Sequence, residues 1–174
     1  MMEQKLVVDA LRSATESVFS TMLGLEVESG TPCIDTDDPG PSNGIIGLVG
    51  LAGEWVGTVS FSCTASLACR MCSRLLNAEF TEVGEDVLDA VSEITNMIVG
   101  GFKTEAETYL GPLGISIPTV VYGLSFAART VGKEHWVVVP FSCGADRFEI
   151  KICLSRNRGF SRYPMVTTGH LAVR

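Results

Sequence analysis

The longest stretch with a helical period runs from Glu85 to Leu110 and has two opposed faces. Apolar residues recur along it at steps of three or four: Val87, Val91, Ile94, Ile98 and Phe102. At about 100° per residue they fall in a stripe roughly 80° wide, which is typical of a helix lying on a core. The sequence therefore predicts one long helix with a buried face.

The opposite face of this helix carries the residues most suited to chemistry: Asp89, Glu93, Asn96, Gly100 and Lys103. Glu93 and Asn96 are three residues apart, so their Cβ atoms are neighbours at roughly 5 to 6 Å. Gly100 and Gly101 each cost about 1 kcal/mol relative to alanine inside a helix. A residue without a side chain at Gly100 would admit a partner's backbone, whereas Gly101, nearer the core, would permit close packing on a sheet.

Length and charge bound the class of protein. The chain of 174 residues fits one domain, and its 20 acidic residues outnumber 13 basic ones. An acidic balance argues against binding the nucleic-acid backbone, which needs a basic footprint. The first residues lack the apolar core of a signal peptide, and no apolar run is long enough to span a membrane. We expect a cytoplasmic protein that binds neither nucleic acid nor membrane.

Six cysteines raise the question of metal or redox chemistry. Cys69 and Cys72 form a lone C-x-x-C in a helical stretch, without a second pair. His135 and His170 are far away in the sequence, so a zinc site would lack its other ligands. We expect reduced, structural cysteines and no metal or cofactor of the chain's own.

The remaining pattern predicts an α/β (α+β) domain with a central, mostly antiparallel sheet flanked by long helices. Helices are expected over 6–23 and 65–77, an exposed acidic loop over 35–43, and a β-hairpin over 44–63. After the long helix, strands are expected over 119–123, 124–130, 135–143 and 147–154. The domain would span 1–154 and be followed by a loosely attached C-terminal tail, 155–174.

A weak internal repeat indicates two similar halves related by a pseudo-twofold axis. The triplet Phe-Ser-Cys occurs at 61–63 and at 141–143. The first helix can also be aligned on the long one so that Glu16 matches Glu93 and Phe19 matches Asn96. In that alignment only the second half carries a carboxylate beside a carboxamide. The alternative is that so short a match arises by chance.

No nucleophile with an adjacent base, and no phosphate-binding glycine loop, occurs in the sequence. Glu93 and Asn96 remain the best candidates for a site, and the alternative for them is a solvated helix face.

The stretch DVLDAVSEITNMIVGGFKT, followed by LGISIPTVVYG, resembles the signature of the CheX chemotaxis phosphatases. These belong to the CheC-like group, which acts on the phosphorylated response regulator CheY. The resemblance is specific in Glu93, Asn96, the glycine at the helix end and Pro118. It implies a CheC-like fold, a homodimer, and hydrolysis of the aspartyl phosphate of a CheY-like response regulator in chemotaxis or two-component signalling. The single Glu-x-x-Asn site is similar to CheX rather than to CheC.

The resemblance also implies roles for the helix face. Asn96 would orient the attacking water and Glu93 would pair with a lysine of the receiver domain, which itself holds Mg²⁺. Asp89, Gly100 and Lys103 would contact the partner. Two alternatives stay open: a non-catalytic binding module for phosphorylated receivers, or a structural domain related to the flagellar switch. The dimer geometry is open as well, and an exposed strand over 136–141 would offer one edge for pairing.

Overall fold

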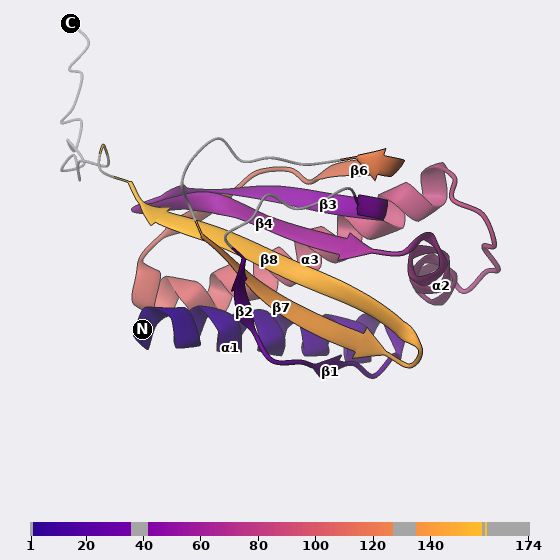
Figure 1. Ribbon diagram of the computed structural model, residues 1–174, viewed down its shortest axis with the longest axis horizontal. Helices are drawn as coiled ribbons and strands as arrows, with labels where there is room; N and C mark the ends of the chain where they lie inside the picture. Colours follow the sequence, from indigo (N-terminus) through magenta and orange to yellow (C-terminus); the bar gives the residue numbers. More distant parts are fainter. Residues whose placement is uncertain (1, 36–41, 127–134, 158, 160–174) are drawn as a thin grey trace, which may run out of the picture.

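The computed structural model describes residues 2–35, 42–126, 135–157 and 159. Among these residues a long helix comes first, four strands follow it, and two more helices precede the second set of four strands (Figure 1). The elements are α1 (Met2–Val18), the π-helical turn η1 (Phe19–Leu23), β1 (Glu28–Ser29), β2 (Cys33–Asp35), β3 (Ser42–Gly53), β4 (Trp55–Cys63), α2 (Ala65–Leu76), α3 (Glu85–Leu110), β5 (Leu113–Ile115), β6 (Thr119–Phe126), β7 (Trp136–Cys143) and β8 (Asp146–Arg156).

The described strands form one antiparallel sheet whose order is symmetrical about its centre. The order is β1-β7-β8-β4-β3-β5, with β2 also paired to β7 and β6 also paired to β3. Each half of the chain therefore supplies a hairpin, and the short strands of one half lie on the hairpin of the other. This arrangement agrees with the predicted fold class and with a pseudo-twofold repeat.

The sheet corrects the strand alignment inferred from the sequence. Its order makes β3 equivalent to β7 and β4 equivalent to β8. The two Phe-Ser-Cys triplets end β4 and β7, which are not equivalent strands. The triplets match because both ends pack into the same core, where Cys63, Phe141 and Cys143 are all buried.

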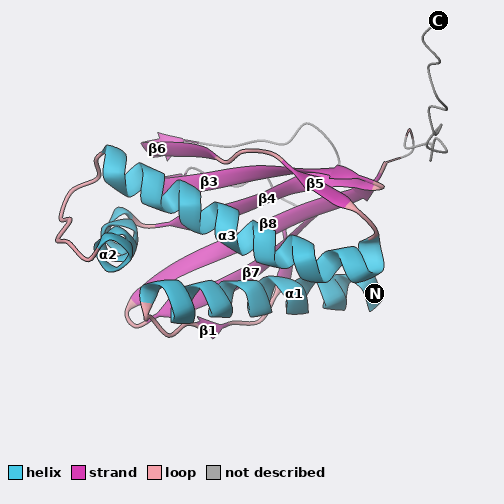
Figure 2. Ribbon diagram, turned by 180° about the vertical axis from the view of Figure 1, so that it is seen from behind, coloured by secondary structure: helices cyan, strands magenta, loops and turns pink. Residues whose placement is uncertain are grey.

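Helices α1 and α3 lie side by side against the same face of the sheet (Figure 2). They run antiparallel, because Ala14 approaches Gly101 near the middle and the Tyr109 hydroxyl donates a 3.0 Å hydrogen bond to the Leu6 carbonyl near the end. A Cβ atom at Gly101 would lie 3.1 Å from the Ala14 Cβ. Gly101 therefore permits close packing as predicted, but against a helix and not against a sheet.

A group of aromatic rings forms the centre of the core. Phe19 stacks on Phe148 with ring centroids 4.8 Å apart, and Phe148 also stacks on Phe141 at 5.0 Å. Phe61 meets the same ring at 5.5 Å. All four side chains are buried, so these contacts join both halves of the sheet to η1, which follows α1.

Turn chemistry fixes the ends of the helices that flank the core. Gly24 adopts a left-handed conformation with φ of 61° and ends η1, which places the helix end where the sequence predicts it. The Thr64 side chain accepts a hydrogen bond from the Leu67 backbone N–H and so caps the start of α2.

Several expected boundaries are wrong. Residues 119–126 form one strand and not two, because the backbone pairs with β3 on both sides of the expected break; residues 127–130 lie outside the described residues. Asp35 ends β2 and its carboxylate lies 3.6 Å from the Lys151 ammonium, while Ser42 and Asn43 belong to β3. Only 36–41 of the expected acidic loop remains outside the described residues.

The expected boundary between domain and tail is also displaced. Strand β8 continues through Ser155 to Arg156, because both residues pair with β4, and Arg156 lies over the Trp55 ring. The Asn157 backbone N–H then donates to the Glu54 carbonyl at 2.8 Å. The remainder of the expected tail, apart from Gly159, lies outside the described residues.

Strand β7 cannot act as a free edge. It pairs with β8 on one side and with β1 and β2 on the other, so the expected pairing of residues 136–141 with a second copy is excluded along this strand.

Candidate functional site

The candidate residues lie on the side of α3 that faces away from the sheet. The predicted inner stripe of α3 is buried throughout. On the other side Asp89 and Glu93 are exposed, and Asn96, Gly100 and Lys103 are partly exposed. Figure 2 shows this helix in front of the sheet with its outer side free of the other described elements. The helix therefore presents a carboxylate and a carboxamide together to solvent.

The two glycines of α3 face different surroundings. A Cβ atom at Gly100 would meet no atom within 4 Å, whereas one at Gly101 would press on Ala14. Packing within the described chain thus explains Gly101 but not Gly100. The absent side chain at Gly100 leaves an open surface one helical turn beyond Asn96.

Lys103 is already engaged in an interaction within its own helix. Its ammonium lies 2.9 Å from the Glu107 carboxylate, and that carboxylate accepts a 2.9 Å hydrogen bond from the Leu113 backbone N–H. The Lys103 hydrogen bond is the largest cause that lowers the pKa of Glu107, followed by the bond from Leu113. Glu107 therefore links the end of α3 to β5, and Lys103 pairs with Glu107 in addition to lying on the candidate face.

Helix α1 repeats the buried pattern of α3 but not its outer face. Seven positions are buried at identical spacing in both helices: Val7, Ala10, Leu11, Ala14, Thr15, Val18 and Phe19, matching Val87, Ala90, Val91, Ile94, Thr95, Ile98 and Val99. Thr15 and Thr95 each donate a 2.7 Å hydrogen bond to the carbonyl four residues earlier. On this match Ser13 corresponds to Glu93, and Glu16 corresponds to Asn96.

The sequence-based match of Phe19 with Asn96 is consequently wrong. Phe19 is fully buried in the aromatic core, and a side chain there does not reach the outer surface. The expectation that only the second half carries the pair still holds for these positions, because Ser13 and Glu16 supply no carboxamide.

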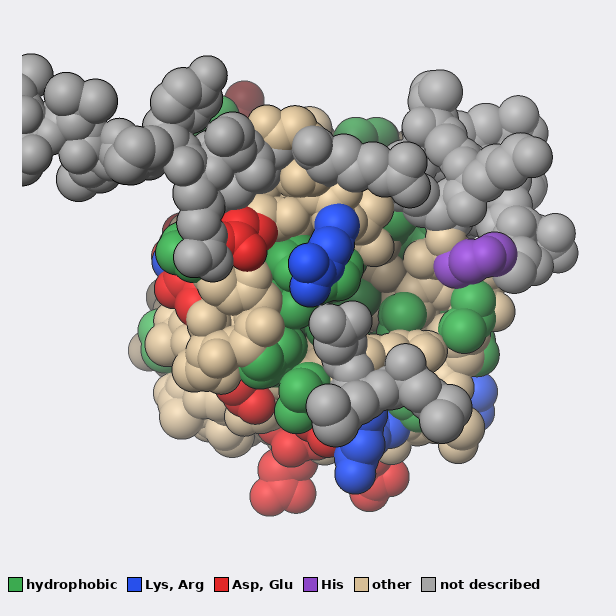
Figure 3. Space-filling view, turned by 90° about the vertical axis from the view of Figure 1, so that its left-hand side faces the viewer, with side chains coloured by type: hydrophobic (Ala, Val, Ile, Leu, Met, Phe, Trp, Pro, Cys, Tyr) green, Lys and Arg blue, Asp and Glu red, His purple; other side chains and the backbone are tan. Residues whose placement is uncertain are grey.

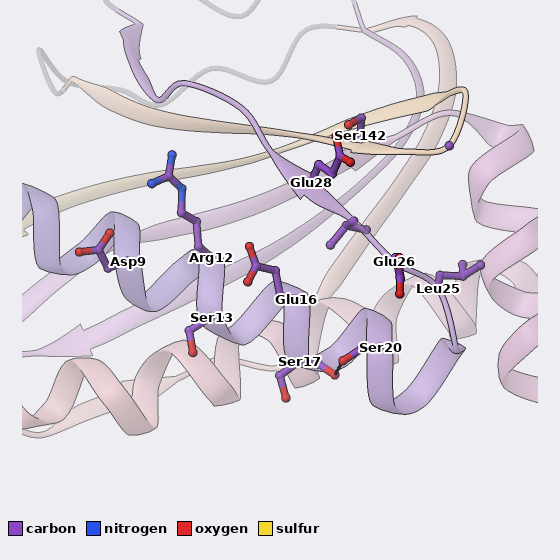
Figure 4. Close-up of a pocket in the computed structure, with 12 residues that line it drawn as sticks. Asp9, Arg12, Ser13, Glu16, Ser17, Ser20, Leu25, Glu26, Glu28 and Ser142 are labelled. Carbon is purple, nitrogen blue, oxygen red and sulfur yellow. Dashed lines mark hydrogen bonds between the residues drawn. The ribbon is translucent and has the colours of Figure 1, made fainter.

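The outer face of α1 lines a groove of about 860 Å³ that does not include the α3 candidates. In Figure 4 Arg12 and Glu16 point from α1 toward the segment that carries Glu28. The Arg12 guanidinium donates a 2.8 Å hydrogen bond to the Gly30 carbonyl, which ties that segment to the helix. Carboxylates line most of its charged surface: Asp9, Glu16, Glu26 and Glu28.

Three of the buried cysteines have thiol pKa values that burial raises. Burial, with smaller contributions from Asp146 and Cys69, raises the pKa of Cys63 to about 12. Burial also raises the pKa of Cys69 and of Cys72, the residues of the C-x-x-C. A thiol with a raised pKa is a poor nucleophile at neutral pH. Across the described residues, no three His, Cys, Asp or Glu side chains are grouped so as to hold a metal ion.

Two residues beneath the candidate site escaped the sequence analysis. Thr95 is fully buried directly before Asn96, and it packs on Gly47 of β3. The available signals were a polar residue inside the apolar stripe of the helix and a glycine inside an apolar strand.

The molecular surface at one end of the sheet is mixed in character. Figure 3 shows acidic, basic and hydrophobic side chains mixed there, without a large patch of one kind. No helix among the described residues is long and apolar enough to cross a membrane.

Comparisons with known proteins now define the class. The model of the family described as chemotaxis phosphatase CheX matches residues 45–142, more than half of the chain and the whole of α3. The chain therefore belongs to the CheX family, as its resemblance implied.

Relatives in this family have the same fold. A CheY-P phosphatase CheX of Thermotoga maritima is 24% identical over 127 residues, which is 72% of this chain and 81% of that protein. The crystal structure of the chemotaxis protein CheX from Vibrio vulnificus has a TM-score of 0.78 at 27% identity and covers 86% of this chain and 99% of its own. The CheX-CheY-BeF3-Mg²⁺ complex from Borrelia burgdorferi has a TM-score of 0.73 at 25% identity, covering 84% and 96% respectively.

Proposed function

We propose that this protein hydrolyses the aspartyl phosphate of a CheY-like receiver domain in cytoplasmic chemotaxis signalling, and that the outer face of α3 is its active surface. One observation carries the proposal: in a member of the CheX family, exposed Glu93 stands beside partly exposed Asn96 on a helix face that the described chain leaves open.

Asn96 is the catalytic residue in this proposal. A carboxamide both donates and accepts hydrogen bonds, so it can hold a water molecule in line with the phosphorus atom. Catalysis of phosphoryl transfer depends mostly on positioning and on electrostatic stabilisation, and neither requires a nucleophile on this chain. The Mg²⁺ that neutralises charge on the phosphoryl group belongs to the receiver.

Glu93 docks the helix and so brings Asn96 to the phosphoryl group. Its exposed carboxylate pairs with the active-site lysine of the receiver in a charge-assisted hydrogen bond. Asp89, one turn earlier, adds a contact at the rim, and Lys103 adds one at the other end while remaining paired with Glu107. The open surface at Gly100 admits the partner's backbone.

Two relatives support this assignment of partner and activity. The Thermotoga maritima protein is named a CheY-P phosphatase, and the Borrelia burgdorferi structure is a complex of CheX with CheY, BeF3 and Mg²⁺.

The decisive assay follows the loss of phosphate from a phosphorylated CheY-type receiver in Mg²⁺. Wild type should accelerate the decay; Asn96→Ala should remove about 100-fold or more of that acceleration, as expected for a positioned catalytic group, and still bind the BeF3-treated receiver. Glu93→Ala should weaken binding and activity together.

Other outcomes of the same assay separate the alternatives. Binding of the receiver by wild type without faster decay would identify a non-catalytic binding module. If several receivers neither bind nor decay faster, the proposed function is wrong, and a structural role related to the flagellar switch becomes the better account.

We also propose that the protein is a homodimer, formed along the outer edge of β6. Strand β6 pairs with β3 on one side, and none of the described strands pairs with its other side. Ile117, Val121 and Tyr122 around this edge are 87%, 38% and 49% exposed. The stretch 111–126 contains no charged residue, whereas the opposite edge carries Glu28 and Asp35. Uncharged edges favour strand pairing, and a twofold axis would pair two copies antiparallel.

Sedimentation of wild type and of two matched variants tests this interface. Val121→Lys should convert the dimer to a monomer, while Ile34→Lys, at a 53% exposed position in β2 on the opposite edge, should leave the dimer intact. A monomeric wild type, or loss of the dimer in Ile34→Lys alone, would contradict the proposal.

A further inference from the structure

Helix α3 lies very close to the sheet directly beneath the candidate site. Thr95 is fully buried, and its hydroxyl donates a 2.7 Å hydrogen bond to the Val91 carbonyl. A Cβ atom at Gly47 would overlap that hydroxyl oxygen and would lie 3.0 Å from the Thr95 Cβ and 3.1 Å from its Cγ2. The absence of a side chain at Gly47 therefore sets how near α3 lies to β3.

This contact belongs to the second helix alone. Thr15 in α1 has the same burial and the same hydrogen bond as Thr95. Strand β7 is equivalent to β3 in the sheet, but it contains no glycine at any position. The fold consequently does not require a glycine under a helix threonine, and its presence under α3 calls for another explanation.

The neighbour of Thr95 in the chain supplies that explanation. Asn96 is the next residue in the chain, and successive residues of a helix move as one rigid unit. A shift of Thr95 away from the sheet therefore moves the Asn96 carboxamide by a similar amount. A displacement of about 1 Å in a positioning group can cost roughly 100-fold in rate.

We propose that Gly47 and Thr95 are positioning residues, which set the depth of α3 and thereby aim Asn96 and Glu93 at the receiver. The inference rests on the proposed function and adds to it a contact on the buried side of the helix.

The test compares two glycines of the same strand. A Cβ atom at Gly50 would lie 3.5 Å from the Ser116 Oγ and 3.7 Å from its Cβ, which are ordinary contacts. Gly47→Ala should lower the decay rate of the phosphorylated receiver at saturating partner by about 10-fold or more, with binding changed by less than about 2-fold. Gly50→Ala should retain the wild-type rate. Adding Thr95→Ala to Gly47→Ala removes the overlapping oxygen and Cγ2 and should restore several-fold of the lost rate.

A second pair of variants keeps the test decisive if Gly47→Ala does not fold. Thr95→Ser and Thr15→Ser remove the same methyl group from threonines of equal burial and should shift the unfolding midpoint equally. Only Thr95→Ser should reduce the saturated rate, by a few-fold.

These measurements distinguish failure of the positioning role from failure of the proposed function. If wild type accelerates the decay but Gly47→Ala matches Gly50→Ala, or if Thr95→Ser matches Thr15→Ser, the positioning role is wrong while the phosphatase function stands. If the variants bind the receiver more weakly but reach the wild-type decay rate at saturating receiver, the contact is merely structural and the inference fails. A wild type that does not accelerate decay overturns the proposed function and this inference with it.

Discussion

Helices α1 and α3 have the same buried face and different outer faces. Both lie on one side of the sheet, and each buries a threonine at the matching place in its inner stripe (Figure 2). Outside, α3 presents Glu93 and Asn96 to solvent, whereas α1 presents Ser13 and Glu16 beside a groove closed in part by the segment 25–30.

The difference shows which part of a repeated fold is constrained. Packing against the sheet fixes the inner positions of both helices, because a change there costs several kcal/mol. The outer positions carry no such constraint, so they differ where function requires it. At the place of Asn96, Glu16 offers a carboxylate that accepts hydrogen bonds but, when ionised, donates none.

The largest expected effect tests the sequence-based alignment of the two helices, in which Phe19 matches Asn96. Phe19→Asn should lower the free energy of unfolding by about 3 kcal/mol or more, because it removes a fully buried ring stacked on Phe148 and buries an amide. Met22→Asn, in the same turn but 48% exposed, should change it by less than about 0.5 kcal/mol. Urea unfolding measures the loss of stability in both variants. Equally small losses would indicate that Phe19 lies at a surface position that corresponds to Asn96.

A smaller effect distinguishes the face of α3 from its contact with α1. Gly100→Ala should stabilise the protein by about 1 kcal/mol through helix propensity, since its Cβ meets no atom. Gly101→Ala should gain less or lose stability, because its Cβ presses on Ala14. Thermal unfolding ranks the two variants. If Gly100→Ala is the more stable variant and yet binds the receiver several-fold more weakly, Gly100 serves the partner; unchanged binding would remove that role.

The smallest effect concerns the ion pair between Lys103 and Glu107 near the end of α3. The hydrogen bond from Lys103, followed by that from the Leu113 backbone, lowers the pKa of Glu107. The pair therefore stabilises the folded protein above the usual pKa range of glutamate, and this stabilisation is lost as pH falls through the lowered pKa. Lys103→Met should therefore be slightly less stable than wild type at pH 7 and should approach it at pH 3, as measured by urea unfolding. A difference of equal size at both pH values would exclude the ion pair as its cause.

The sequence was most informative where a long periodic pattern met a strong physical constraint. All five apolar residues of the stripe Val87 to Phe102 are buried, and the outer residues Asp89 and Glu93 are exposed, because a helix with a single apolar stripe turns that stripe toward the core. The end of the first helix at Gly24 was likewise predictable from its required left-handed conformation.

Other features could not be read from local pattern. Strands β1 and β2 contain two and three residues, too few for an alternating pattern, and only pairing with β7 makes them strands. The close contact of Gly47 with Thr95 joins distant parts of the chain. The sequence-based alignment of the two helices was wrong because it was anchored on the identical residues Glu16 and Glu93. The buried positions give the correct alignment, and only the structure shows which positions are buried.

The most direct test of the account measures phosphate decay from the same receiver with Asn96→Ala and with Glu16→Ala, which replace matching outer residues of α3 and α1. If the outer face of α3 alone carries the activity, Asn96→Ala loses nearly all acceleration while still binding the receiver, and Glu16→Ala acts as wild type. Wild-type decay rates with Asn96→Ala, or a comparable loss with Glu16→Ala, would contradict the claim that the outer face of α3 alone carries the activity.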